Sequence, residues 1–297
     1  MYAPLALLAV LSTWVFWQWA TDNRSREDAA ELAWPVSYTF LLLAGLYTHY
    51  FFPIIILAHG ILVALYLFAP QLFPNTIGPQ ADHRWLRITL GWGSTAAIAV
   101  LGYVVWVPVF LRQIGGRAGT SPDLMGFLAE SGKWLGVGDT LPLPTATLPL
   151  IAGAILILLG ILVSARKRAV LPLVMTAVPF GGSFLVGATD PAFFKFLLTI
   201  IPFLCILAAL SWQLKGWLRV IPMVLTVVVI AGSSLSLHAM YTDPAYARAD
   251  YRGMAARIAT EAHPNAAIIL DAPNQWEVFT YYHRDGAPVF PLPEGSA

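Results

Sequence analysis

Charged side chains are scarce in this sequence. Asp, Glu, Lys and Arg make up 11% of the 297 residues, whereas hydrophobic residues make up 58%. A soluble domain of ordinary composition carries roughly 25% charged residues, so the composition excludes that class. With a mean hydropathy of +0.69, the sequence predicts an integral membrane protein.

Other absences narrow the choice further. The net charge is only +1, so nothing indicates a nucleic-acid partner. The single cysteine, Cys205, can form no intramolecular disulfide. No Walker loop, GxGxxG, HExxH, CxxC or GxSxG motif is present, so nucleotide, zinc and serine-hydrolase sites have no support. No cofactor is predicted, and whether a divalent cation assists is left open.

Long charge-free runs are abundant. A helix that crosses the ~30 Å hydrocarbon layer needs about 20 apolar residues, and the runs fit this length. Pro202 lies inside its run, where we expect it to kink the helix. We predict an all-α polytopic domain over residues 1–241. Its eight spans lie near Ala3–Trp19, Ala33–Tyr47, Phe51–Phe68, Ile88–Phe110, Thr145–Val163, Ala169–Val186, Phe196–Trp212 and Val220–Met240.

The loops differ in positive charge, which predicts orientation. The more basic set of alternate loops is cytoplasmic by the positive-inside rule. It holds Arg24, Arg26, Arg84, Arg87, Arg166, Lys167, Arg168, Lys215 and Arg219, against Arg112, Arg117, Lys133 and Lys195 on the other side. We therefore predict a multi-pass protein of the cell membrane, with the outer loop 112–143 and the tail 242–297 outside the cytoplasm.

The two ends of the sequence carry a further expectation. In this orientation Met1 lies on the outer face without the basic n-region or cleavage site of a signal peptide. We expect a fragment, with an odd number of spans missing before Met1, and the C-terminal end is expected to be cut as well.

Both outer segments contain patterns of secondary structure. In the loop, Ser121 is predicted as N-cap and Pro122 as first residue of a helix that stops at Gly132. Its apolar face (Leu124, Met125, Phe127 and Leu128) predicts a helix lying on the membrane surface. The tail predicts the start of a small α/β domain. Its expected elements are a helix over 250–259, a buried strand over 266–270, a helix capped by Asn274 and a strand over 288–290.

Three features at the outer ends of spans could bind a ligand. They are the cluster Tyr47–Phe52, the run from Asp190 to Lys195, and Trp106 with Arg112. Each also has a structural interpretation, as an interfacial aromatic belt, a lysine snorkelling to lipid phosphates, or an interfacial anchor. A lysine beside hydrocarbon needs an anion, and a specific phosphate would serve. His59 lies in mid-span and is interpreted as an interhelical hydrogen-bonding residue rather than a catalyst.

The ordered set of outer motifs resembles the GT-C superfamily of membrane glycosyltransferases, near protein mannosyltransferases and the Rgt-type sugar transferases of lipopolysaccharide. The motifs are Met1-Tyr-Ala-Pro-Leu-Ala6, Tyr47-Thr-His-Tyr50, Trp106-Val-Pro108, Phe194-Lys-Phe-Leu197 and Asp250-Tyr-Arg-Gly253.

The resemblance implies that a sugar passes from a polyprenyl-phosphate donor to an extracytoplasmic acceptor, whether lipid, glycan or protein. It implies a donor cavity lined by Tyr47, His49, Tyr50 and Trp106, and a lipid phosphate bound by Lys195 and Arg112. Lys195 stands where the family usually has arginine, and it lacks the bidentate fork of arginine.

Catalysis is where the sequence departs from this family. The family carries its catalytic acid in the first outer loop, where a carboxylate can take a proton from the acceptor. No acidic residue precedes Asp22, which is predicted to be cytoplasmic. The acid is therefore expected upstream of Met1, and this fragment alone is expected to be inactive. The alternatives are a multi-spanning transporter or lipid flippase, and a non-catalytic membrane scaffold.

Overall fold

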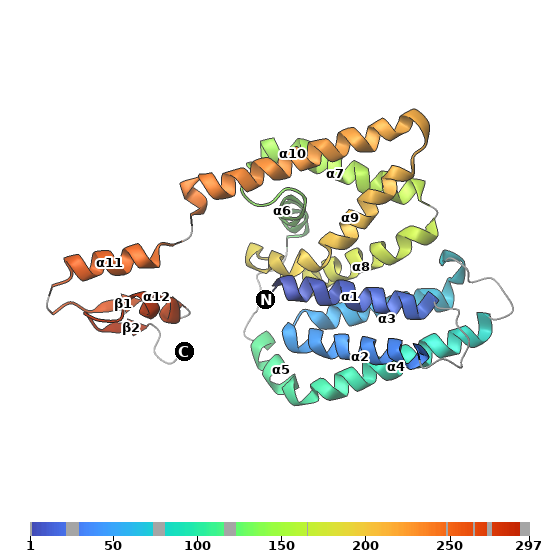
Figure 1. Cartoon of the computed structure of the whole chain (residues 1–297), viewed down its shortest axis with the longest axis horizontal. Helices are drawn as coiled ribbons and strands as arrows, with labels where there is room; N and C mark the ends of the chain where they lie inside the picture. The colour runs from blue at the N-terminus through green and yellow to red at the C-terminus, as the bar shows by residue number, and fades with distance from the viewer. Residues whose placement is uncertain are drawn as a thin grey trace. The chain divides into compact units, whose positions relative to one another are not determined.

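The computed structural model describes residues 2–21, 30–73, 81–115, 123–164, 166–247, 249–263, 265–271 and 275–291. The chain divides into two compact units, Met1–Ala239 and Met240–Ala297. All regular secondary structure among the described residues of the first unit is helical (Figure 1). Its α-helices are α1 (Tyr2–Thr21), α2 (Ala30–Thr48), α3 (Phe52–Phe68), α4 (Ala81–Tyr103), α5 (Val107–Gly115), α6 (Leu124–Gly136), α7 (Leu143–Val163), α8 (Arg166–Leu185), α9 (Ile201–Leu210) and α10 (Val220–Thr242).

Short 3₁₀-helices connect several of these. Two are important for the site: η2 (Val104–Trp106) joins α4 to α5, and η3 (Pro191–Thr199) precedes α9. The others are η1 (Pro70–Leu72), η4 (Ser211–Gln213), η5 (Gly216–Arg219) and η6 (Pro244–Tyr246).

The long helices are typical of a multi-pass membrane protein. Among the described residues, five helices are long and apolar enough to cross a membrane, or six if the bent pair of η3 with α9 counts as one span. Helices occupy all eight ranges predicted from the sequence, but two of them, Leu32–Thr48 and Phe52–Phe68, are shorter than a usual span. The count of eight therefore stays a prediction. The predicted kink is confirmed, because the bent pair turns by 59° just before Pro202.

The core of this unit lies where α1, α2, α3, α4 and α8 meet. α2 packs on α1 and α4, α3 packs on α8, and α9 joins α8 to α7. The largest fully buried side chains here include Tyr38, Phe52 and Met175. α10 contacts α7, where Gly232 lies against Pro149, while most of its other apolar side chains are exposed. Apolar surface of this kind suits contact with lipid.

The helix predicted within the loop over residues 112–143 differs from its prediction at both ends. Its N-cap is Asp123, whose carboxylate accepts hydrogen bonds from the backbone N–H groups of Met125 and Gly126. Ser121 and Pro122, which were predicted as the cap and the first helical residue, lie outside the described residues. The predicted stop at Gly132 is also wrong, because α6 continues to Gly136. Trp134 and Leu135 pack against a buried cluster there, and this packing outweighs the low helix propensity of glycine.

The predicted apolar face of α6 is split by the fold. Leu124, Met125 and Leu128 are exposed, whereas Phe127 is buried against Phe180, Phe184 and Phe194. Phe127 therefore anchors α6 to the helix bundle and does not lie against the membrane as expected.

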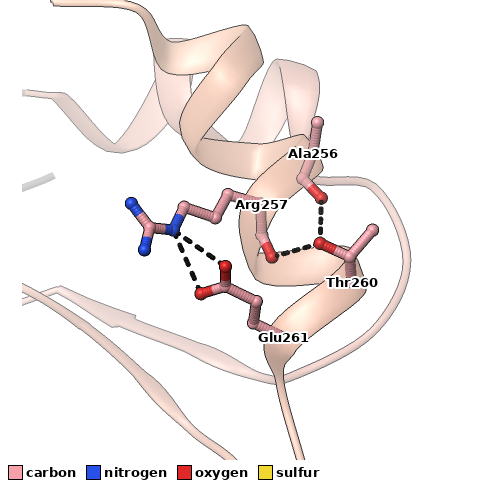
Figure 2. A network of polar contacts seen from close by, with 4 residues as sticks. All are labelled: Ala256, Arg257, Thr260 and Glu261. Atoms are coloured by element: carbon pink, nitrogen blue, oxygen red, sulfur yellow. Dashed lines mark hydrogen bonds and ion pairs between the residues drawn. The ribbon is translucent and has the colours of Figure 1, made fainter.

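The second unit contains α11 (Tyr251–Glu261), β1 (Ile268–Leu270), α12 (Trp276–Tyr282) and β2 (Val289–Pro291). The strands pair in parallel, with Ile268 opposite Val289. β1 was predicted to be buried, but this is wrong: Ile269 is 64% exposed, and Ile268 and Leu270 are only partly buried. The predicted cap Asn274 lies outside the described residues. On the surface of α11, Arg257 Nε donates to both oxygens of Glu261 at 3.0 Å (Figure 2).

Candidate functional site

The site-forming residues gather where several helix ends of the first unit meet. Tyr2 begins α1, His49 lies between α2 and α3, and Lys195 lies in η3. The Tyr2 ring is 5.5 Å from the His49 ring and 5.9 Å from the Phe196 ring. Segments that are far apart in the sequence thus place an aromatic ring, an imidazole and an ammonium group together.

The helical pitch of η3 decides which way its side chains face. In a 3₁₀-helix, residues three apart lie above one another, so the nine-residue η3 has three faces. Phe194 and Leu197 share a fully buried face that packs towards α6. Phe193 and Phe196 share a second face, with their rings 5.6 Å apart, and it meets α1 and His49. Lys195 lies on the third face and is only partly buried.

Lys195 is the charged member of this group. Its Nζ lies 5.0 Å from the centre of the Tyr2 ring, a cation–π distance. Among the residues that the structure describes, no carboxylate lies within ion-pair distance of Nζ, and Nζ makes no hydrogen bond. The face of an aromatic ring attracts the positive charge, but it is not a conventional hydrogen-bond acceptor for the three N–H groups of the ammonium. The ammonium therefore keeps its capacity to bind an anion.

His49 is buried, with only 6% of its surface exposed. Its Nδ1 accepts a hydrogen bond of 3.0 Å from the backbone N–H of Phe51, and its ring meets Phe196 edge-on at 4.6 Å. The family resemblance implied that His49 lines a donor cavity. In the structure it is packed among aromatic rings, so His49 also contributes to stability.

Tyr47, Tyr50 and Trp106 belong to a neighbouring aromatic group. The Tyr47 ring is 5.3 Å from Tyr103 and 6.4 Å from Trp106, and its hydroxyl donates to the backbone oxygen of Gly102 at 2.8 Å. Tyr50 connects the two groups, since its ring lies 6.5 Å from His49 and 5.7 Å from Phe110. The four predicted cavity residues therefore lie along one series of ring contacts that ends at Tyr2 and Lys195.

Arg112, the second predicted phosphate ligand, is not brought to this group by any contact. It lies in the last turn of α5 and is exposed. Within the described part of the chain, no hydrogen bond, ion pair or ring contact joins it to another side chain. Among the described residues, the structure therefore brings Lys195 to the aromatic group and does not bring Arg112 there.

The mid-span His59 forms a separate, fully buried polar cluster. The Thr13 hydroxyl donates to the backbone oxygen of Ala9 at 2.7 Å, so it accepts the 3.0 Å hydrogen bond from His59 Nε2–H. His59 Nδ1 then accepts from the Tyr38 hydroxyl at 2.9 Å. These bonds join α1, α2 and α3, which confirms that His59 is an interhelical hydrogen-bonding residue.

Sequence reasoning missed several of these residues. Tyr2 and Phe196 were not singled out as site residues, and Thr13 and Tyr38 were not recognised as partners of His59. The available signals were weak: a tyrosine at the outer end of a span, and a hydroxyl facing inward in an apolar helix. Neither signal indicates which residue, distant in the sequence, the side chain will contact.

Within the described segments, no group of three His, Cys, Asp or Glu side chains is placed to hold a metal ion. No protein-family model, characterised protein or solved structure matches this chain.

Proposed function

We propose that this protein is a membrane glycosyltransferase that moves a sugar from a polyprenyl-phosphate donor to an acceptor outside the cytoplasm. The observation that carries the proposal is Lys195, a partly buried lysine at one end of a bundle of apolar helices. Its ammonium lies over Tyr2 and has no carboxylate partner among the described residues. A lysine held beside hydrocarbon is stabilised by an anion.

A lipid-linked phosphate fits this position for two reasons. Its phosphate oxygens accept charge-assisted hydrogen bonds from an ammonium group. Its prenyl chain is apolar, as are the exposed side chains of the surrounding helices. A soluble phosphate would satisfy only the first condition, so we propose the lipid-linked form.

The adjacent aromatic series suits the sugar. Tyr47 and Trp106 are 54% and 41% exposed, and both are in ring contact with the group that leads to Lys195. Aromatic side chains combine a flat apolar face with a polar tip, which matches the mixed surface of a sugar ring. The donor phosphate at Lys195 and the sugar at these rings would bind together.

The proposed reaction needs a cation near the leaving group. The acceptor hydroxyl attacks the anomeric carbon, the bond from that carbon to the phosphate oxygen breaks, and polyprenyl phosphate leaves with an additional negative charge. A preorganised cation stabilises that developing charge. Lys195 takes this role, and a base must accept the proton of the attacking hydroxyl. None of the described residues is assigned as that base.

Binding of the lipid phosphate tests the proposal without needing an acceptor. The protein is reconstituted in phosphatidylcholine nanodiscs and titrated with decaprenyl phosphate, with decaprenol and inorganic phosphate as parallel ligands. Lys195→Ala should weaken binding of decaprenyl phosphate about 10- to 100-fold, because a hydrogen bond to a charged group contributes about 1.5–3 kcal/mol. Lys195→Arg should retain binding.

Lys133→Ala is the matched control, since the Lys133 ammonium already has a carboxylate partner in Asp139 at 3.4 Å. This control should leave the affinity for decaprenyl phosphate unchanged. Equal affinities for decaprenyl phosphate in Lys195→Ala and wild type would overturn the proposal. Equal affinities for decaprenol and decaprenyl phosphate in the wild type would also overturn it.

A transporter or lipid flippase is a second candidate, and one observation favours it. The pair of η3 and α9 is bent by 59°, and interrupted helices are common at the substrate sites of transporters. Protein reconstituted in vesicles separates the two functions. Movement of a fluorescent prenyl phosphate between leaflets, without transfer of its sugar, would favour the flippase.

A further inference from the structure

We propose that Tyr2 is the positioning residue of the phosphate site: its ring holds the Lys195 ammonium in place while leaving the charge of that ammonium available. The inference rests on the proposed function and deepens it, because it says how the fold prepares a lone lysine to bind phosphate. The observation is the 5.0 Å separation between Lys195 Nζ and the centre of the Tyr2 ring.

Tyr2 is itself held by its neighbours. Its ring is in contact with the rings of His49 and Phe196. Phe196 lies 5.7 Å from Phe51, which is buried at the start of α3. The ring that receives the ammonium is therefore supported by α1, the junction of α2 with α3, and η3.

A ring is a suitable partner for a cation that must bind a second group. A lysine side chain has four rotatable bonds. Ordering them on binding costs conformational entropy and lowers the affinity. Contact with Tyr2 orders the side chain in advance. A carboxylate would order it too, but it would neutralise the charge and occupy the N–H groups. The quadrupole of the ring attracts the ammonium without doing either.

Lys133 shows the contrasting arrangement in the same unit. Its ammonium lies 3.4 Å from the Asp139 carboxylate, so it is both held and neutralised. No carboxylate takes the corresponding place at Lys195 among the described residues. The difference is what we expect if one lysine is structural and the other serves a ligand.

The test compares two substitutions of Tyr2 in the nanodisc binding assay with decaprenyl phosphate. Tyr2→Phe keeps the ring and should change the dissociation constant by less than about two-fold. Tyr2→Leu removes the ring and should raise the dissociation constant about 2- to 12-fold, the range expected for ordering one long side chain. Tyr241→Leu, which removes an exposed tyrosine of α10, is the control and should have no effect.

A double-mutant cycle separates positioning from packing. Tyr2→Leu should weaken binding only when Lys195 is present, so it should add nothing in the Lys195→Ala background. Thermal unfolding of each variant shows that the protein is folded in every arm. An equal loss from Tyr2→Leu with and without Lys195, or an equal loss from Tyr2→Phe and Tyr2→Leu, would overturn the positioning role.

The two proposals fail separately. If Lys195→Ala binds decaprenyl phosphate as well as wild type does, the proposed function fails. If Lys195→Ala weakens binding and Tyr2→Leu does not, the phosphate site stands and the role of Tyr2 fails.

Discussion

Two lysines of the first unit show how neighbouring side chains decide what a charged residue can bind. Lys133 is paired with Asp139, whereas Lys195 faces the ring of Tyr2. The same comparison applies to two buried histidines. His59 has both ring nitrogens bonded between helices in the interior, and His49 lies among aromatic rings at the end of the bundle. Residue type alone does not distinguish the roles of the two lysines or of the two histidines. The side chains in contact with each of them do.

The cluster around His59 gives a prediction at the residue scale. Tyr38→Phe removes the hydroxyl that donates to His59 Nδ1 and leaves that nitrogen buried without its donor. We expect the free energy of unfolding to fall by about 1 kcal/mol, and by no more than about 2 kcal/mol, as for other interhelical hydrogen bonds in membranes. Unfolding in mixed micelles with increasing SDS measures the change.

Tyr241→Phe provides the control for this measurement, because Tyr241 is 81% exposed and its hydroxyl makes no hydrogen bond to any residue that the structure describes. Equal stability of Tyr38→Phe and wild type would show that the hydrogen bond contributes nothing.

At the scale of elements, small residues and irregular helices decide how the first unit is assembled. η3 keeps a 3₁₀ pitch for nine residues, and Pro202 follows its end, so the segment meets α6 on one face and α1 on another. α7 and α9 approach closely at Gly160, where a Cβ atom would overlap the backbone oxygen of Leu207. Close backbone contact at glycine is common between membrane helices.

Gly160→Ala should therefore destabilise the protein by about 2–3 kcal/mol, because a backbone carbonyl cannot rotate away as a side chain can. Gly153→Ala on the same helix is the matched control. Its Cβ would lie 3.8 Å from Val229 Cγ2, an ordinary contact, so we expect no loss of stability. Thermal unfolding in detergent compares the two variants, and similar stabilities for both would contradict the close crossing of α7 and α9.

On the scale of the whole molecule, its apolar surface and the uneven charge of its loops bear on how it lies in a membrane. Much of α10 and α7 is apolar and exposed, as Val227 at 60% and Leu148 at 66% illustrate. The basic residues cluster in one set of alternate loops. Together these features predict that Arg166–Arg168 is cytoplasmic and that the second unit is outside.

Single-cysteine labelling tests that orientation on a Cys205→Ala background. A membrane-impermeant maleimide applied to intact cells should label Ala249→Cys and leave Arg168→Cys unmodified, and both should react after permeabilisation. Ala249 is chosen because Asp250 accepts a hydrogen bond from Gly253 N–H at the start of α11 and should be kept. If only Arg168→Cys is labelled in intact cells, the orientation is opposite to the predicted one.

The sequence by itself determined where the apolar helices lie, that Pro202 kinks one of them, and that His59 bonds between helices. The helices follow from local composition, because apolar runs of membrane length have few alternatives to a helix. The kink follows from the ring of proline, and the bonding of His59 follows from the need of a polar group in an apolar helix for a partner. Only the tertiary structure decided the partners. Periodicity gave the apolar face on which Phe127 lies, but not which helix meets that face. Phe127 turned inward because Phe180, Phe184 and Phe194 surround it, and Lys195 met Tyr2 because η3 keeps its 3₁₀ pitch beside the start of α1.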